Sequence, residues 1–157
     1  MITMRKSQRS AFTVVELMIV VAIIADLVTV AVPAFMRSRN LAQEARYISD
    51  MRTASGAFEM YAAENNSYPP AAQPGITPNG MLTYLGDFPW SDTNSVGGQW
   101  VWSPGYKNCT AVLLTTFPYP MDEMEMADVD QRMDDGVLAT GSFREADNQN
   151  YYYILEP

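Results

Sequence analysis

The side chains most able to hold a ligand lie in the acidic segment MDEMEMADVDQRMDDG, residues 121–136. Asp130, Asp134 and Asp135 precede a glycine and offer the oxygen atoms that hard cations prefer. An EF-hand does not fit the spacing, because Arg132 stands where that loop needs an oxygen ligand and no glycine follows it. A solvated acidic turn is the simpler explanation of the segment, so we expect no cofactor and no metal site here, with a cation site as the alternative.

Other catalytic groups are scarce in this sequence. There is no histidine, which removes the commonest general base and metal ligand. No G-x-S-x-G motif, P-loop or metal-ligand array occurs, and the adjacent carboxylates of Asp134 and Asp135 more often point apart than together. The one cysteine, Cys109, cannot form an internal disulfide, so we expect a lone buried thiol or an intermolecular one. We do not expect an enzyme.

One further carboxylate, Glu16, lies in a long run of apolar residues, and the helix that this run forms determines its position. The run covers residues 12–35, and a helix of that length is about 36 Å long, enough to cross a hydrocarbon core of about 30 Å. A charge in hydrocarbon is unfavourable unless it has a partner. A plain signal anchor explains the apolar run but not Glu16, and a soluble core helix does not explain so long a run.

The residues before the run form a basic leader, residues 1–11, which carries Arg5, Lys6 and Arg9 and no acid. No A-x-A cleavage triplet occurs in the run, so removal as an ordinary signal peptide is not expected. The positive-inside rule keeps the N-terminus in the cytoplasm, although Arg37 and Arg39 beyond the run weaken this orientation.

The segment AFTVVELMIVVAIIADLVTVAVPAF resembles the N-terminus of type IV pilins and of type II secretion pseudopilins, and the G-type major pseudopilin fits best. The resemblance covers about 40 residues. It implies that prepilin peptidase cuts between Ala11 and Phe12 and methylates the new amino group of Phe12, although the family usually has glycine where Ala11 stands. The family's proline falls on Pro33, where we expect a kinked or loosened helix.

The resemblance gives Glu16 a role in assembly rather than catalysis. In a filament, its carboxylate can neutralise the amino group of Phe12 on a neighbouring subunit, which fixes the axial register. Asp26 departs from the family pattern and has no clear role. Major pseudopilins bind calcium in a C-terminal loop, which keeps calcium at Asp130, Asp134 and Asp135 as the alternative to no cofactor.

Past Pro33 the sequence predicts an amphipathic helix over residues 36–66, ended by Pro69-Pro70. We expect one apolar face and an exposed face that includes Glu44. The expected apolar face contains Leu41, Ala45, Ile48, Met51, Ser55, Phe58 and Ala62. Together with residues 12–35, this gives one long helix.

Residues 67–157 predict a head of small antiparallel strands, so the fold class is α+β with a long N-terminal helix packed on a sheet. A short helix is expected near Gly80–Leu85, and strands are expected in GGQWVW, CTAVLLTTF and QNYYYILEP. In the last strand, Tyr152 and Ile154 face one side, and Tyr151, Tyr153 and Leu155 face the other. We expect the three tryptophans in the aromatic core rather than on a sugar-binding platform.

The charge of the head bears on its partners. It carries twelve acids against three cations, a net charge of −9, and such a field repels phosphate backbones. We therefore expect no nucleic-acid partner and favour a pseudopilus subunit over a surface pilin for adhesion, motility or DNA uptake. A non-assembling membrane-anchored binding module is the remaining alternative.

The resemblance also implies partners and location. These are other copies of the chain, other pseudopilins, prepilin peptidase, an inner-membrane platform protein, an ATPase and membrane lipid. The implied location is a bacterial inner membrane, crossed once, with the N-terminus cytoplasmic and the head periplasmic until the subunit enters a periplasmic filament.

Overall fold

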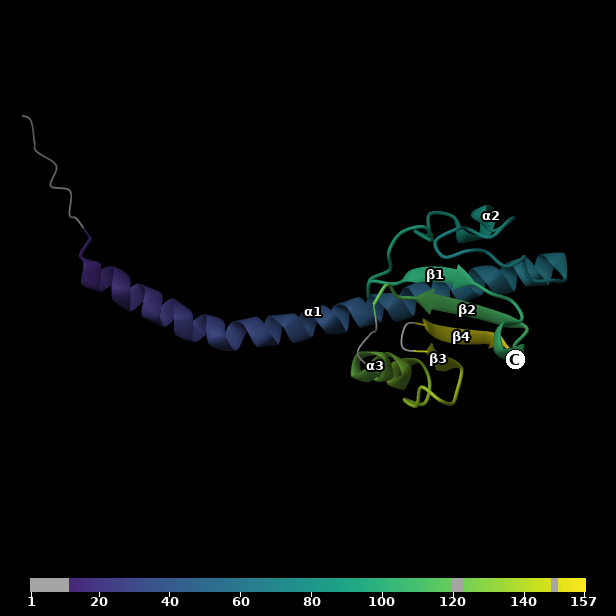
Figure 1. Cartoon of the computed structure of the whole chain (residues 1–157). Coiled ribbons are helices and arrows are strands. Elements are labelled where there is room, and N and C mark those ends of the chain that lie inside the picture. The colour runs from purple at the N-terminus through teal and green to yellow at the C-terminus, as the bar shows by residue number, and fades with distance from the viewer. Residues whose placement is uncertain (1–11, 120–122, 148–149) are drawn as a thin grey trace, which may run out of the picture. The chain divides into compact units, whose positions relative to one another are not determined.

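The computed structural model describes residues 12–119, 123–147 and 150–157. The longest element is α1, Val14–Asn65, a single helix of 52 residues (Figure 1). The chain divides into two compact units, one ending at Asn40 and one from Leu41 to Pro157, and α1 contributes to both. The predicted single helix ending near Asn65 is therefore confirmed.

The unit from Leu41 is an α+β head with a four-stranded antiparallel sheet. The strands are β1 (Gln99–Trp102), β2 (Ala111–Thr116), β3 (Phe143–Asp147) and β4 (Asn150–Glu156). Their order in the sheet is β1-β2-β4-β3. The three predicted strands are confirmed, while β3 has no counterpart among the expectations. A short helix α2, Leu82–Leu85, lies in the predicted segment, and a 3-10 turn, Tyr106–Asn108, follows β1.

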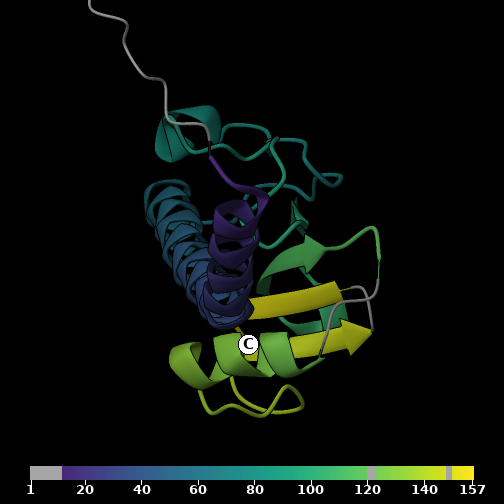
Figure 2. The same ribbon diagram turned by 90° about the vertical axis from the view of Figure 1, so that its left-hand side faces the viewer.

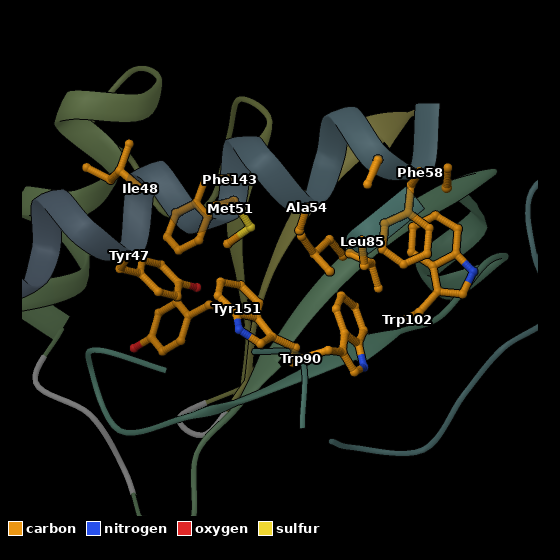
Figure 3. Packing of buried hydrophobic residues seen from close by; sticks show 14 of the residues in the cluster. Tyr47, Ile48, Met51, Ala54, Phe58, Leu85, Trp90, Trp102, Phe143 and Tyr151 are labelled. Atoms are coloured by element: carbon orange, nitrogen blue, oxygen red, sulfur yellow. The ribbon is translucent and has the colours of Figure 1, made fainter. Parts of the chain in front are cut away.

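An aromatic core fills the space between the outer part of α1 and one face of the sheet (Figure 3). Phe58 stacks on Trp102 with ring centroids 3.9 Å apart, and Tyr47 stacks on Trp100 at 5.4 Å. The Tyr47 hydroxyl shares a buried hydrogen bond of 2.8 Å with the Thr115 hydroxyl. All three tryptophans, Trp90, Trp100 and Trp102, are buried. The prediction of an aromatic core is confirmed.

The buried face of α1 differs in part from the predicted stripe. Ile48, Met51, Ser55 and Phe58 are buried as expected, and Ala62 is half-buried. Leu41 is exposed because it comes before Glu44, the first buried residue of α1, and Ala45 is exposed because it lies outside the buried face formed by Glu44, Tyr47, Ile48 and Met51. Glu44, expected on the exposed face, is buried.

The opposite face of the sheet holds a smaller apolar cluster built on Val112, Leu114 and Tyr152. Ile154 packs on this cluster, whereas Tyr151, Tyr153 and Leu155 belong to the aromatic core. The predicted alternation along the last strand is therefore confirmed. Cys109 lies at the border of the smaller cluster and is half-buried, so the expectation of a buried thiol is wrong, and an intermolecular disulfide stays a prediction.

The acidic segment contains a helix, α3, Glu123–Met133, rather than a solvated turn. Met126, Val129 and Asp130 are its buried residues, at the spacing of one helical face. This helix packs near β3, the edge strand of the sheet (Figure 1, and the lower helix in Figure 2). The interpretation as a turn is wrong because three buried positions give the segment a packed side.

Candidate functional site

The start of α1 is built by a reciprocal pair of hydrogen bonds between Thr13 and Glu16. The Glu16 carboxylate oxygen Oε2 accepts from the backbone N–H of Thr13 at 2.9 Å and from its hydroxyl at 2.8 Å. The N–H of Glu16 in turn donates to the Thr13 hydroxyl at 3.2 Å. This is a capping box, in which the N-cap threonine and the glutamate three residues later satisfy free donors of the first turn.

The capping box holds the Glu16 carboxylate against Thr13, the residue that follows Phe12, at which the expected mature chain would begin. Phe12 lies directly before the cap and is 75% exposed. Ala11, the other residue of the expected cleavage site, lies outside the described residues. The T-x-x-E spacing was visible in the sequence as a helix-start signal, but the sequence interpretation did not use it.

The part of α1 before Asn40 presents a continuous apolar surface. It contains a stretch long and apolar enough to cross a membrane, and none of that stretch is buried in the head. Asp26 lies in this stretch with no hydrogen-bond or ion-pair partner among the described residues. Pro33 is inside the helix, which continues through it. The Thr29 hydroxyl donates to the Ala25 carbonyl at 2.8 Å, one turn before the proline. The kink at Pro33 stays a prediction.

A second candidate site lies at the end of α3, where Asp130, Asp134 and Asp135 converge. One carboxylate oxygen from each lies within 4.8 Å of those of the other two. Asp130 is fully buried, and neither of its oxygens has a hydrogen-bond partner among the described residues. Burial, and next the carboxylates of Asp135 and Asp134, raise the pKa of Asp130 to about 6. A buried carboxylate without a partner next to two others favours an added cation.

The loop after α3 holds the other two carboxylates in place. Asp135 accepts hydrogen bonds from the Thr140 hydroxyl at 2.7 Å and the Val137 N–H at 2.9 Å, which lower the pKa of its carboxyl group. Asp134 accepts from the backbone N–H of Ser142. Gly141 has a positive φ of 74°, and a Cβ there would collide with the Asp134 carboxylate.

Three carboxylates of this kind could serve as ligands to a hard cation such as calcium. The three side chains supply hard oxygen atoms, and Ca²⁺ takes six to eight oxygen ligands, some of them backbone carbonyls and water. The sequence indicated these same three residues as candidate cation ligands. It gave no sign that Asp130 would be buried.

Arg132, the residue that breaks the EF-hand pattern, has a structural partner instead. Its Nη1 atom lies 3.3 Å from Oε2 of the buried Glu44, so it joins α3 to α1. Burial raises the pKa of Glu44, the charge of Arg132 opposes that rise, and Asp128 and Glu125 add to it. The sequence did not indicate this pair, because its members lie far apart in the chain and each alone reads as a surface residue.

Comparisons with known proteins agree with the resemblance found in the sequence. Type II secretion system core protein G of Aeromonas hydrophila is 34% identical over 70 residues, 45% of this chain and 49% of that protein. Core protein G of Pseudomonas aeruginosa is 33% identical over the same shares. The type IV wide pilus major component PilA4 of Thermus thermophilus is 40% identical over 57 residues, 36% of this chain and 44% of PilA4.

These matches have a limited extent. The chain spans about half the length of the curated relatives it matches, and no protein-family model matches it. Among solved structures, the major type IV pilin PilA1 from Clostridium difficile has a TM-score of 0.53 at 20% sequence identity, covering 75% of this chain and 97% of that one. Over about half of its relatives' length, the chain is therefore similar to type II secretion core G proteins, and it has the fold of a type IV pilin.

Proposed function

We propose that this chain is a pseudopilin-like filament subunit. It is processed by prepilin peptidase and assembled into a type II secretion pseudopilus that helps to export folded proteins. The observation that carries the proposal is the Thr13–Glu16 capping box at the start of an exposed helix long enough to cross a membrane. The described chain does not shield the apolar surface of this helix from water. In the proposal, lipid shields it before assembly and other subunits shield it afterwards.

The first step is cleavage between Ala11 and Phe12, followed by methylation of the Phe12 amino group. The new positive N-terminus then lies one residue before Thr13, next to the carboxylate that caps the helix. In a filament, the Glu16 carboxylate forms an ion pair with the positively charged amino group of Phe12 on a neighbouring subunit. Each charge is unfavourable alone in an apolar bundle, and pairing them selects one axial register between subunits.

The subunit does no chemistry of its own in this proposal, and it is not an enzyme. It crosses the inner membrane once with the N-terminus in the cytoplasm, and the head lies in the periplasm. A platform protein and an ATPase drive the extraction of α1 from lipid into the filament, where other copies and other pseudopilins replace the lipid. The acidic head makes nucleic acid an unsuitable partner.

A calcium ion on the head is part of the proposal. Asp130, Asp134 and Asp135 would hold it, and its charge would offset the repulsion among three carboxylates. The bound ion would fix the loop after α3 against β3. It would take no part in a reaction.

A surface type IV pilus is the alternative, favoured by the match to PilA4 and by the pilin fold. Many pilins of that kind close a C-terminal loop with a disulfide, which the single cysteine of this chain cannot do. This difference favours the pseudopilus. A non-assembling membrane-anchored module is the third reading, and it requires an unprocessed N-terminus.

Mass spectrometry of the N-terminus tests the proposal first, with the chain expressed with and without prepilin peptidase. We expect N-methylated Phe12 at the start of the mature chain only with the peptidase, and an intact leader in both samples would refute the proposal. In a strain that carries the complete machinery, Glu16→Ala should abolish filaments while cleavage continues. Loss of exoprotein secretion in a deletion strain supports the pseudopilus, and loss of surface pili alone supports the alternative.

A further inference from the structure

Asp26 is a charged residue in the apolar part of α1 that the proposed function does not use. It is the only charged residue in the sequence between residues 17 and 36. Its side chain is exposed, with no hydrogen-bond or ion-pair partner among the described residues. A carboxylate is unfavourable both in lipid and in a bundle of apolar helices unless it gains a cation or a proton. Since α1 supplies no cation within two turns, a cation for Asp26 has to come from another molecule.

The same helix carries two arginines that also lack partners. Arg37 and Arg39 are exposed, and neither has an ion-pair partner among the described residues. Residues 27–43 contain no acid, and the next acid along the helix, Glu44, is paired with Arg132. Each arginine is therefore available to a carboxylate of another molecule.

Helical geometry places Arg37, and not Arg39, on the face of Asp26. With 3.6 residues per turn, Arg37 follows Asp26 by about three turns and lies about 20° from it around the axis, whereas Arg39 lies about 140° away. Along the axis Arg37 is about 16 Å beyond Asp26, too far for a contact within one chain. Between them on this face lie Val30, which is 76% exposed, and Pro33, which is also exposed. One apolar face of α1 thus carries a carboxylate and an arginine at separate levels.

We propose that Asp26 of one copy pairs with Arg37 of a second copy whose α1 is shifted along the axis by about 16 Å. In the proposed function all copies cross the membrane in one orientation, so the two helices are parallel. A second copy is the occupant because each chain carries both charges on one apolar face and can neutralise neither of them. Two different sites meet in this contact, so it repeats from copy to copy and builds a filament rather than a closed dimer.

This inference rests on the proposed function and adds a second assembly contact to that of Phe12 with Glu16. The first contact requires an axial shift of about 6 Å between two copies, whereas the pair of Asp26 with Arg37 requires about 16 Å. The same neighbour cannot satisfy both shifts. Each copy therefore contacts one neighbour through Phe12 and Glu16, and another, further along the filament, through Asp26 and Arg37. The second contact also gives Asp26 a partner that lipid does not supply, which favours the move of α1 from the membrane into the filament.

Apolar substitutions test the pair in cells that carry the complete assembly machinery. We expect Arg37→Leu to lower the yield of sheared filaments at least fivefold, because it leaves the Asp26 carboxylate unpaired in an apolar bundle. Asp26→Leu should lower the yield less, because an unpaired arginine can extend its long side chain to water. Combining the two substitutions should restore at least half of the yield.

The matched control is Arg39→Leu, which removes the same charge from another face of α1 and should leave the yield within twofold. Immunoblots of the membrane fraction confirm that each variant is present in equal amount, so that the yield reports assembly. A normal yield from Arg37→Leu, no rescue in the combination, or an equal loss in Arg39→Leu would overturn the inference.

A cross-link identifies the partner of Asp26 directly. In a Cys109→Ser background, Asp26→Cys with Arg37→Cys removes both charges together, so filaments should still form. The two positions are about 16 Å apart in one chain, beyond the Cα separation of about 7 Å that a disulfide allows, so each disulfide joins two copies. We expect a ladder of multimers from oxidised filaments, and no ladder from Asp26→Cys with Arg39→Cys.

The other outcomes count against the contact. Bands that stop at the dimer indicate an antiparallel pair, and filaments without any ladder indicate that the partner of Asp26 is a different protein. Either result refutes the inference. If Glu16→Ala abolishes filaments while Arg37→Leu assembles normally, only this inference fails. If the leader stays intact in the presence of prepilin peptidase, the proposed function itself fails.

Discussion

Asp130→Asn should stabilise the chain without calcium and lose that advantage when calcium is present. The Asp130 carboxyl group is fully buried, and its pKa is about 6 in the folded chain against an ordinary value of 3.8. Between these two values the folded chain holds a proton that the unfolded chain has released. Stability from this group is therefore complete below about pH 4 and is lost as the pH rises toward 6.

The size of the loss follows from the two pKa values. At about 1.4 kcal/mol for each pH unit, the ionised carboxylate lowers the free energy of unfolding by at most about 3 kcal/mol at pH 7.5. An amide at residue 130 does not ionise and can donate to the neighbouring carboxylates. Without calcium, Asp130→Asn should therefore be more stable than the unchanged chain by about 2–3 kcal/mol at pH 7.5 and equally stable at pH 4.

Calcium should remove this difference. A site with a dissociation constant of about 0.1 mM, filled at 10 mM Ca²⁺, stabilises the unchanged chain by about 2.7 kcal/mol. Asp130→Asn lacks one of the three carboxylates and should gain little. The unchanged chain and the variant should then be about equally stable at pH 7.5.

Urea unfolding of the full chain in detergent measures these differences, followed by the fluorescence of the three buried tryptophans of the head. Each variant is compared at pH 4 and pH 7.5, in EGTA and in 10 mM CaCl₂. Asp128→Asn, at an exposed residue of the same helix, is the control and should change little in any condition. The reasoning is refuted if Asp130→Asn shifts stability equally at both pH values, or if calcium stabilises the variant as much as the unchanged chain.

Three further substitutions test the packing of the head by the same urea assay. Phe58→Ala removes a fully buried ring that stacks on a tryptophan, and should lower the free energy of unfolding by about 3–5 kcal/mol. Tyr47→Phe removes one partner of the buried hydroxyl pair with Thr115 and should cost about 1–2 kcal/mol, with Thr115→Val in the same chain recovering part of the loss. Gly141→Ala places a methyl group against the carboxylate of Asp134 at a positive φ. It should lower stability by about 1–2 kcal/mol and weaken calcium binding measured by titration calorimetry.

The sequence predicts α1 and the strands at the centre of the fold because their patterns are strong. The apolar run and the amphipathic stripe have helical periodicity over many turns, and Pro69-Pro70 ends the helix. The strand of Ala111–Thr116 is almost entirely buried, and the last strand alternates between the two clusters. Patterns of this length are compatible with few other secondary structures.

The elements that the sequence did not predict, α3 and β3, have weak hydrophobic patterns, because contacts with the rest of the head determine their conformation. In α3 the buried face consists of Met126, Val129 and Asp130, and the carboxylate hides the apolar period. Only Phe143 is buried in β3, as befits an edge strand. Glu44 became a buried residue because Arg132 reaches it from a helix that local sequence does not place beside α1. The capping box at Thr13 and Glu16 was readable from spacing, whereas the burial of Asp130 was not.

The position of β4 in the sheet has a consequence for the order of events during synthesis. β4 comes after every other described element in the chain, yet it lies between β2 and β3 and pairs with both. The sheet therefore stays open until residues 150–156 have left the ribosome. If the head crosses the membrane as proposed, such late closure would keep the head unfolded during translocation and leave folding to the far side.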